Sequence, residues 1–134
     1  MYKVTKEILF CYGHRLLNYD GKCQHPHGHN GKCEIELSSS SLDKRGMVFD
    51  FEDIKKTVQS WIDIELDHKM LLCREDPLVD VFKKLNEPVF VMDGNPTAEN
   101  IAKAIYDYSV SKKLPVSSVR LWETPHSFAA YGKP

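Results

Sequence analysis

Hydrophobic and polar residues alternate in two segments near the start of the chain. Such alternation is typical of a strand with one face in the core and the other in solvent. The apolar positions are Val4, Ile8, Phe10 and Tyr12 in the first segment, and Cys33, Ile35 and Leu37 in the second. The intervening residues 13–28 are rich in glycine, histidine, asparagine and aspartate. We therefore predict two strands joined by a long loop.

Two longer segments show apolar residues at helical spacing. The first helix follows Asp50, a good capping residue, and extends past Ile62. The second extends from about Asn95 to Lys113. A short third helix is predicted over residues 76–85, because it opens with an aspartate followed by proline, a common helix start.

Extended segments account for most of the remaining chain. We predict a short strand over residues 47–51, an extended segment over 88–92, and two closing strands over 116–124 and 127–131. Half-buried strands with only two long helices are typical of an α+β fold with an antiparallel sheet. The 134 residues are expected to form one domain, 1–134.

Composition narrows the classes of function. Lys and Arg number 18 and Asp and Glu number 19, so the formal net charge is −1. A near-neutral chain has no electrostatic reason to bind nucleic acid or an anionic membrane. No apolar run approaches the roughly 18 residues that span a bilayer, and the first residues lack the apolar core of a secretion signal. We expect a cytoplasmic protein with reduced cysteines.

Histidines cluster around residue 27. Three of the six lie within five residues, and His14 stands at the end of the first predicted strand. If the second strand begins at His27, then His27 and His29 point to one face, which His14 shares when the two strands form a hairpin. Three neutral imidazoles with a fourth position open are the pattern of a catalytic zinc site. Surface histidines are the alternative, and His25 could replace one ligand, although Pro26 restricts its backbone.

Three further positions carry side chains suited to chemistry. Cys23 lies four residues before His27, so it could face a metal as a thiolate or bind it as a fourth ligand. Asp67-His68 places a carboxylate beside an imidazole at a helix end, where capping or solvation is the alternative role. Glu123 has the parity of the buried positions in its strand. A buried carboxylate is costly unless it meets the N–H groups of a ligand or an internal Arg or Lys.

Six short motifs, in this order and spacing, resemble the 6-pyruvoyl-tetrahydropterin synthase/6-carboxy-tetrahydropterin synthase family over nearly the whole chain. Each motif is weak alone, but the ordered set is specific. The motifs are Gly13-His14-Arg15-Leu16, Cys23-x-x-x-His27-Gly28-His29-Asn30, Gly46-Met47-Val48-Phe49-Asp50-Phe51, Leu66-Asp67-His68, Asn95-Pro96-Thr97-Ala98-Glu99-Asn100 and Trp122-Glu123-Thr124, with a closing Tyr131.

The resemblance implies an architecture and an assembly. The fold would be the tunnelling fold, an antiparallel sheet with two main helices on one face. Family members assemble as hexamers of two trimers, in which the sheets join into a barrel and the active sites lie at subunit interfaces. Asp67, His68 and Glu123 are therefore expected to serve a site whose zinc belongs to a neighbouring chain.

The resemblance also implies a role for each matching residue. The zinc ligands would be His14, His27 and His29. The general base would be Cys23, and its proton-relay partners Asp67 and His68. The residues around the pterin substrate would be Glu123, which anchors the pyrimidine edge, and Thr97.

Only three residues separate Cys23 from His27, which resembles bacterial 6-carboxy-tetrahydropterin synthases of the queuosine (7-deazaguanine) pathway. Animal-type pyruvoyl synthases carry a longer insertion there. The resemblance therefore implies a zinc-dependent lyase that converts 7,8-dihydroneopterin triphosphate to 6-carboxy-5,6,7,8-tetrahydropterin, acetaldehyde and triphosphate. Cys23 argues against members that serve folate synthesis, which carry Glu in its place.

Two alternative functions remain, and the roles of some residues stay open. The first alternative is a 6-pyruvoyl-tetrahydropterin synthase, and the second is a non-enzymatic structural zinc module closed by the cysteine. His25 stands where arginine is common in the family. The candidate triphosphate contacts are Lys22, Lys69 and Arg74.

Overall fold

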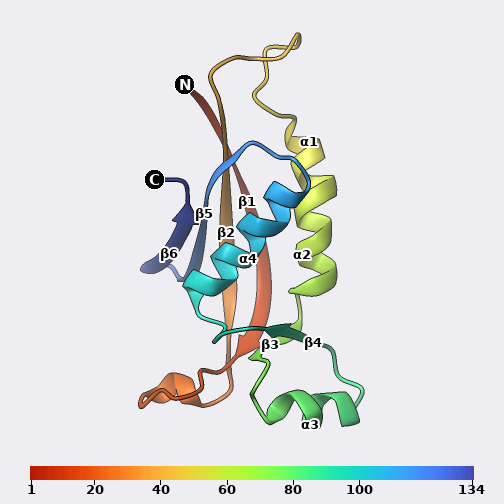
Figure 1. Ribbon diagram of the computed structural model, residues 1–134, viewed down its shortest axis with the longest axis vertical. Helices are drawn as coiled ribbons and strands as arrows, with labels where there is room; N and C mark the ends of the chain where they lie inside the picture. The colour runs from red at the N-terminus through yellow and green to blue at the C-terminus, as the bar shows by residue number, and fades with distance from the viewer.

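One six-stranded sheet forms the framework of the molecule. The structure is a computed structural model that describes all residues, 1–134. The strands lie in the order β4-β3-β1-β2-β5-β6, and β1 and β2 run along most of the molecule (Figure 1). Their bounds are β1 (Tyr2–His14), β2 (His27–Ser39), β3 (Lys69–Cys73), β4 (Val89–Met92), β5 (Val116–Thr124) and β6 (Ser127–Gly132).

The two strands expected from alternation, β1 and β2, and the two expected at the end of the chain, β5 and β6, are all present. Neighbours among them pair antiparallel. The hairpin of β1 and β2 places His14 opposite His27 and Tyr12 opposite His29. Directly opposite residues in a ladder point to the same face of the sheet. The register therefore brings the three predicted metal ligands together.

The sheet is mixed, which corrects the expectation of a purely antiparallel sheet. β3 pairs in parallel with the last three residues of β1, and β4 pairs in parallel with β3. The strand β3 was not predicted, because Leu71, Leu72 and Cys73 are all buried and show no alternation. Continuous apolar runs are usual for strands covered on both faces.

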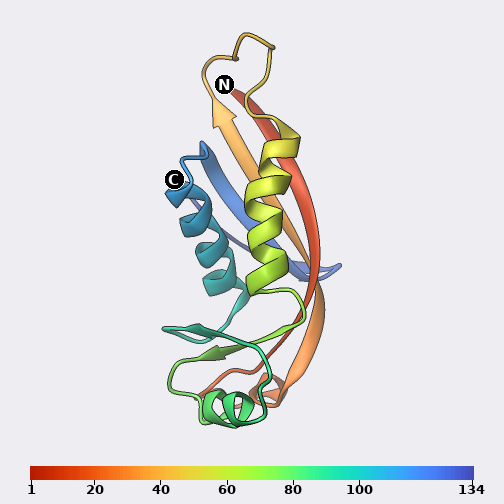
Figure 2. The ribbon, with the colours of Figure 1, turned by 90° about the vertical axis from the view of Figure 1, so that its right-hand side faces the viewer.

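Both predicted main helices are present, and they cover one face of the sheet (Figure 2). The first is a continuous helical run of α1 (Phe51–Ile54), the π-helical segment η2 (Lys55–Gln59) and α2 (Ser60–Glu65); the second is α4 (Ala98–Ser111). The rings of Trp61 and Tyr108 stack at 4.5 Å between these two helices. The predicted short helix is α3 (Leu78–Lys84), and a 3₁₀ turn, η1 (Lys22–Gln24), lies in the loop after β1. None of the helices has both the length and the apolar character needed to cross a bilayer.

The short strand predicted over residues 47–51 is wrong. Residues 47–50 form an irregular loop, and Phe51 begins α1. Local hydrogen bonds to Asp43 hold this loop, because its carboxylate accepts from the amides of Arg45 and Met47. Asp50 then caps the helix by accepting from the amide of Glu52 at 2.9 Å, as expected. Backbone amides that are hydrogen-bonded in this way do not require partners in a neighbouring strand.

The hydrophobic core lies between the inner face of the sheet and the two main helices. Its 20 buried residues include Ile8 and Phe10 of β1, Ile35 of β2, and Ile101 and Ile105 of α4. The opposite, outer face of the sheet carries charged residues such as Lys32, Glu34 and Arg120. The inner face thus stays apolar along most of its length and becomes polar only where the histidines begin.

Candidate active site

Three imidazoles converge at the end of the β1–β2 hairpin. The Nε2 atom of His14 lies 3.0 Å from Nε2 of His27 and 3.1 Å from Nε2 of His29. His14 is buried at 2% exposure, and the other two rings are half-buried. The predicted convergence of the three histidines is therefore present in a single chain.

Backbone carbonyls orient two of the three rings. The Nδ1 atom of His14 lies 2.6 Å from the carbonyl oxygen of Pro96, and Nδ1 of His27 lies 2.8 Å from that of His25. A carbonyl accepts only, so each Nδ1 must carry the proton and each Nε2 presents a lone pair to the cluster. Burial lowers the pKa of His14 to about 4, against the hydrogen bond to Pro96, and its two histidine neighbours lower it further. His14 is therefore a neutral donor at neutral pH.

The donor set suits a metal ion. In the neutral rings, the lone pairs of His14 and His27 face one another at 3.0 Å and repel unless a cation or proton lies between them. Metal–nitrogen distances of about 2.0–2.1 Å in a tetrahedral zinc site place the nitrogens about 3.3 Å apart, close to the spacing seen here. Hydrogen bonds from Nδ1 to carbonyls are also the usual outer support of metal-binding histidines. The cluster could bind a metal ion with small adjustments.

Glu123 of β5 lies beside the histidine cluster of its own chain, on the face that its strand parity predicts. The resemblance implied instead that it serves the zinc of a neighbouring chain. Its Oε2 atom is 3.8 Å from Nε2 of His29, and its side chain is 29% exposed. No arginine or lysine pairs with this carboxylate, so the internal-cation alternative finds no support in the ion pairs of the structure. One side of the carboxylate remains available to a ligand.

Thr97 occupies the start of α4, directly after the residue that holds His14. Its hydroxyl oxygen accepts from the amide of Asn100 at 3.2 Å and so caps the helix. Asn95 fixes the neighbouring loop, because its side-chain amide exchanges two hydrogen bonds of 2.8 Å with the backbone of Leu17. The motif around Thr97 therefore ties α4 to the loop that follows β1.

Cys23 lies in η1 within that same loop and is half-buried. Its sulfur is not among the donor atoms that lie within 4.8 Å of one another in the histidine cluster. The loop is pinned by a backbone hydrogen bond of 2.9 Å from Leu16 to the carbonyl of Cys23. The cysteine is therefore close in sequence to the cluster without belonging to it in this structure.

Asp67 and His68 form a second group, separate from the three histidines. The Oδ2 atom of Asp67 lies 2.8 Å from Nδ1 of His68, and its Oδ1 accepts from the amide of Cys11 at 2.9 Å. Burial acts to raise the pKa of Asp67, but the hydrogen bonds from Cys11 and His68 lower it overall. His68 has a φ of 59°, a left-handed conformation that is uncommon outside glycine.

The two groups lie on opposite faces of the sheet. Cys11, which contacts Asp67, alternates with Tyr12 along β1 and points to the outer face. A cavity of about 550 Å³ is lined by Cys11 and His68, and also by His27 and His29 of the cluster. Within one chain, the two groups thus border one cavity, but their donor atoms remain two separate sets.

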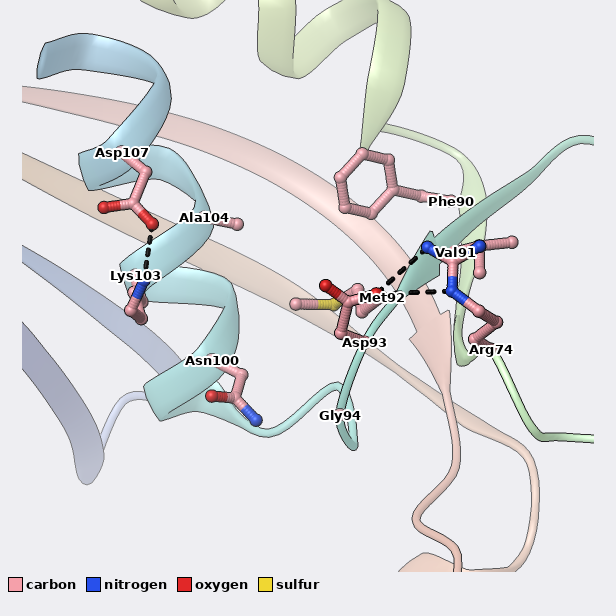
Figure 3. A pocket seen from close by; sticks show the side chains of 10 residues that line it. All are labelled: Arg74, Phe90, Val91, Met92, Asp93, Gly94, Asn100, Lys103, Ala104 and Asp107. Carbon is pink, nitrogen blue, oxygen red and sulfur yellow. Dashed lines mark hydrogen bonds and ion pairs between the residues drawn. The ribbon is translucent and has the colours of Figure 1, made fainter. Parts of the chain in front are cut away.

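The candidate triphosphate contacts are dispersed. Lys22 is exposed in η1, and Lys69 lines the outer cavity next to His68. Arg74 lies elsewhere, in a cavity of about 260 Å³ between β4 and α4, and Figure 3 shows its guanidinium directed at Asp93. The Nη2–Oδ1 distance of that pair is 3.0 Å.

Sequence reasoning missed three supporting residues. Pro96 supplies a carbonyl, which no side-chain pattern reveals. Cys11 contributes a backbone amide to Asp67. Tyr12 was read as a core residue, yet its ring packs edge-on against His14 at 5.2 Å. The only signal for Tyr12 was its position two residues before a predicted ligand.

Comparisons with known proteins identify the family of this chain. The family model described as 6-pyruvoyl tetrahydropterin synthase matches residues 3–134. A Haemophilus influenzae protein named 6-carboxy-5,6,7,8-tetrahydropterin synthase is 39% identical, with 98% of this chain and 99% of the relative covered. A Rickettsia conorii protein of the same name is 37% identical, with 96% and 98% covered.

Solved structures show the same fold. A Wolinella succinogenes protein superposes with a TM-score of 0.83 at 28% identity, covering 99% of this chain and 98% of the other. The 6-pyruvoyl tetrahydropterin synthase of Caenorhabditis elegans superposes with a TM-score of 0.71 at 26% identity, covering 100% and 98%. The chain therefore belongs to the 6-pyruvoyl tetrahydropterin synthase family.

Proposed function

We propose that this protein is a zinc-dependent lyase that converts 7,8-dihydroneopterin triphosphate to 6-carboxy-5,6,7,8-tetrahydropterin, acetaldehyde and triphosphate. The observation that carries the proposal is the convergence of three Nε2 atoms beside the carboxylate of Glu123. The names of the Haemophilus and Rickettsia relatives support this product, as does the short spacing between Cys23 and His27. We place the reaction in the cytoplasm and in queuosine (7-deazaguanine) synthesis.

Three neutral imidazoles favour zinc as the metal, because borderline nitrogen donors in a tetrahedral arrangement suit that ion. The ligands would be His14, His27 and His29. Bound there, zinc would act as a Lewis acid on the side-chain oxygens of the substrate, an effect of several kcal/mol. Because Cys23 stands outside the cluster, a fourth position would remain for the substrate.

The remaining steps belong to residues of the protein. Glu123 would accept from the ring N–H and the exocyclic amine of the pterin and so orient its side chain toward the histidines. Cys23, as a thiolate, would remove a proton from the activated side-chain carbon, which contributes about 10²–10⁴-fold when the pKa is matched. Loss of triphosphate would follow. Addition of one water molecule to the side-chain carbonyl next to the ring would then let the bond between the first two side-chain carbons break, which leaves a carboxylate on the ring and, after protonation, releases acetaldehyde.

Asp67 and His68 would relay protons for a Cys23 in another subunit. The proposal is supported by the separation of their donor atoms from those of the three histidines of their own chain. The sheet also offers edges for assembly, because β3 covers β1 only at Tyr12–His14 and β6 forms the last strand. Free strand edges invite pairing with other chains. We propose a hexamer of two trimers in which such edges join into a barrel.

The test is product identification by mass spectrometry after incubation of zinc-loaded protein with 7,8-dihydroneopterin triphosphate. We expect 6-carboxy-5,6,7,8-tetrahydropterin together with one equivalent of acetaldehyde. A 6-pyruvoyl product without acetaldehyde would instead make the protein a pyruvoyl synthase, as the family description and the Caenorhabditis neighbour suggest. No turnover, together with a four-donor zinc site that includes the sulfur of Cys23, would indicate a structural zinc module.

A further inference from the structure

One buried polar atom in the structure has no hydrogen-bond partner, and it lies next to the candidate site. It is the hydroxyl oxygen of Tyr12, a residue that is only 3% exposed. Buried hydroxyl groups are normally paired, since an unpaired one costs about 1–3 kcal/mol. An exception in a native protein therefore calls for an explanation, and a functional role is one of them.

The ring of Tyr12 crosses from β1 over β2 toward β5. A Cβ atom added to Gly31 of β2 would lie 3.0 Å from Cε1 of Tyr12, so the glycine makes room for the ring. In the antiparallel β2–β5 ladder Lys32 opposes Trp122, so Glu123, the next residue of β5, continues that strand on the side from which Gly31 enters the ladder. The ring of Tyr12 therefore extends over β2 in the direction of the Glu123 carboxylate.

The surroundings fix the direction of this ring. Phe10 stacks against it at 5.3 Å, and the rings of His14 and His29 lie 5.2 and 5.6 Å away. Burial, and then the negative charge of Glu123, raise the pKa of Tyr12 well above its ordinary value. A tyrosine hydroxyl has an ordinary pKa of about 10, so the Tyr12 hydroxyl can donate a hydrogen bond at neutral pH.

Glu123 needs such a donor once the histidines bind a metal. Its Oε2 atom now lies 3.8 Å from Nε2 of His29. A metal-bound Nε2 carries no proton, so it cannot donate a hydrogen bond to Glu123. A carboxylate has about four acceptor positions, and the two donors of a pterin edge leave some of them free.

We propose that the Tyr12 hydroxyl donates a hydrogen bond to the Glu123 carboxylate in the pterin-bound protein, which makes Tyr12 a positioning residue for the pterin anchor. This inference rests on the proposed function. Tyr12 acts through Glu123 and does not touch the substrate, because its hydroxyl is hidden from solvent whereas Glu123 is 29% exposed. The Tyr12 hydroxyl is unpaired in the free protein, and it would form its hydrogen bond with Glu123 when the pterin binds.

The test compares Tyr12→Phe with the wild-type protein, both zinc-loaded, using pterin-6-carboxylate as a fluorescent probe of binding. Loss of one hydrogen bond to a charged group predicts an affinity about 10-fold weaker. Zinc content stays at the wild-type value, because the phenyl ring keeps the contacts with His14 and His29. The metal-free variant melts at the same temperature as wild type or higher, since no hydroxyl is left unpaired.

Two further variants separate this role from a structural one. Tyr108→Phe, on α4 against Trp61, removes a hydroxyl far from the site and leaves probe affinity unchanged. In a double-mutant cycle, adding Tyr12→Phe to Glu123→Gln weakens binding much less than it does in the wild-type background, because the two residues act in one contact.

The outcomes are distinct. Equal probe affinity of Tyr12→Phe and wild type, loss of zinc from Tyr12→Phe, or additive effects in the double-mutant cycle would each overturn the role of Tyr12. Absence of probe binding by the wild-type protein would overturn the proposed function itself, and with it this inference.

Discussion

At the scale of single residues, the candidate site combines imidazole nitrogens that could bind a metal with carboxylates that accept hydrogen bonds. Hydrogen bonds to two carbonyls set the proton on Nδ1 of His14 and of His27, which leaves Nε2 free. The sequence showed which histidines would meet, because parity along a strand is readable. It did not show the carbonyl partners or the unpaired hydroxyl of Tyr12, because these depend on how distant segments pack.

Replacing Cys23 with alanine tests the assignment of the base. Because the sulfur lies outside the histidine cluster, we expect Cys23→Ala to retain zinc and pterin affinity while turnover falls about 10²–10⁴-fold. Metal analysis, probe binding and single-turnover kinetics on the same preparation measure the three quantities. Loss of zinc would show that Cys23 is a ligand.

Asp76 provides a pH-dependent contribution to stability through Arg15, the residue after His14. Its buried carboxylate accepts from Nε of Arg15 at 2.8 Å and from the amide of Leu78, which starts α3. The Arg15 hydrogen bond lowers the pKa of Asp76 below its ordinary 3.8, against the effect of burial. The contribution is therefore complete above that ordinary pKa and is lost as pH falls through the lowered folded-state value.

We expect Asp76→Asn to reduce the free energy of unfolding by about 2 kcal/mol at pH 7, with the difference from wild type shrinking below pH 4. Urea denaturation between pH 3 and pH 7 measures it. Asp93→Asn is the matched control, since Asp93 is 94% exposed in its pair with Arg74 and should contribute less than about 1 kcal/mol. A pH-independent difference for Asp76→Asn would contradict the ion-pair explanation.

At the scale of elements, the strands that alternate and the helices with clear caps were predicted, and the others were not. β3 was missed because Leu71, Leu72 and Cys73 form a continuous apolar run without alternation. The segment 47–51, expected as a strand, is a loop in which Asp43 accepts from the amide of Met47. Apolar content alone did not distinguish these two segments. The helix α4 was predicted well, because Thr97 and the apolar stripe that follows it agree.

Thr97 is expected to stabilise α4 through its cap. Thr97→Ala should lower the free energy of unfolding by about 1 kcal/mol, because the amide of Asn100 loses its acceptor. Thr97→Ser keeps the hydroxyl and should stay within a few tenths of a kcal/mol of wild type. Urea unfolding monitored by circular dichroism compares the three proteins. Equal losses for alanine and serine would assign the effect to the methyl group instead.

At the scale of the whole molecule, the separation of the two side-chain groups is the dominant feature. The histidines and Glu123 form one group, whereas Asp67 contacts the backbone amide of Cys11 and the ring of His68 in another. In the proposed assembly, one chain would contribute the two groups to two different sites. The sequence contained all these residues, but only the strand pairing shows that they are apart.

Mixing two inactive variants tests whether sites are shared between chains. Cys23→Ala and His68→Ala each lack one component, so co-assembled hexamers should contain intact sites built from one chain of each kind. Random mixing predicts recovery of about one quarter of wild-type activity. The measurement is turnover after co-refolding, with separately refolded variants combined afterwards as the control. No recovery, despite mixed hexamers by mass spectrometry, would place both residues in one chain's site.

The ring of His14 joins segments that are 82 residues apart, because one nitrogen faces the other histidines while the other holds the Pro96 carbonyl. An imidazole is rigid, so immobilising one nitrogen immobilises its opposite edge. Metal loading should therefore slow amide hydrogen exchange in the first turn of α4, and chelation should reverse this. Amide hydrogen exchange in the helix that begins at Ala98 would therefore show whether the metal is bound to the enzyme.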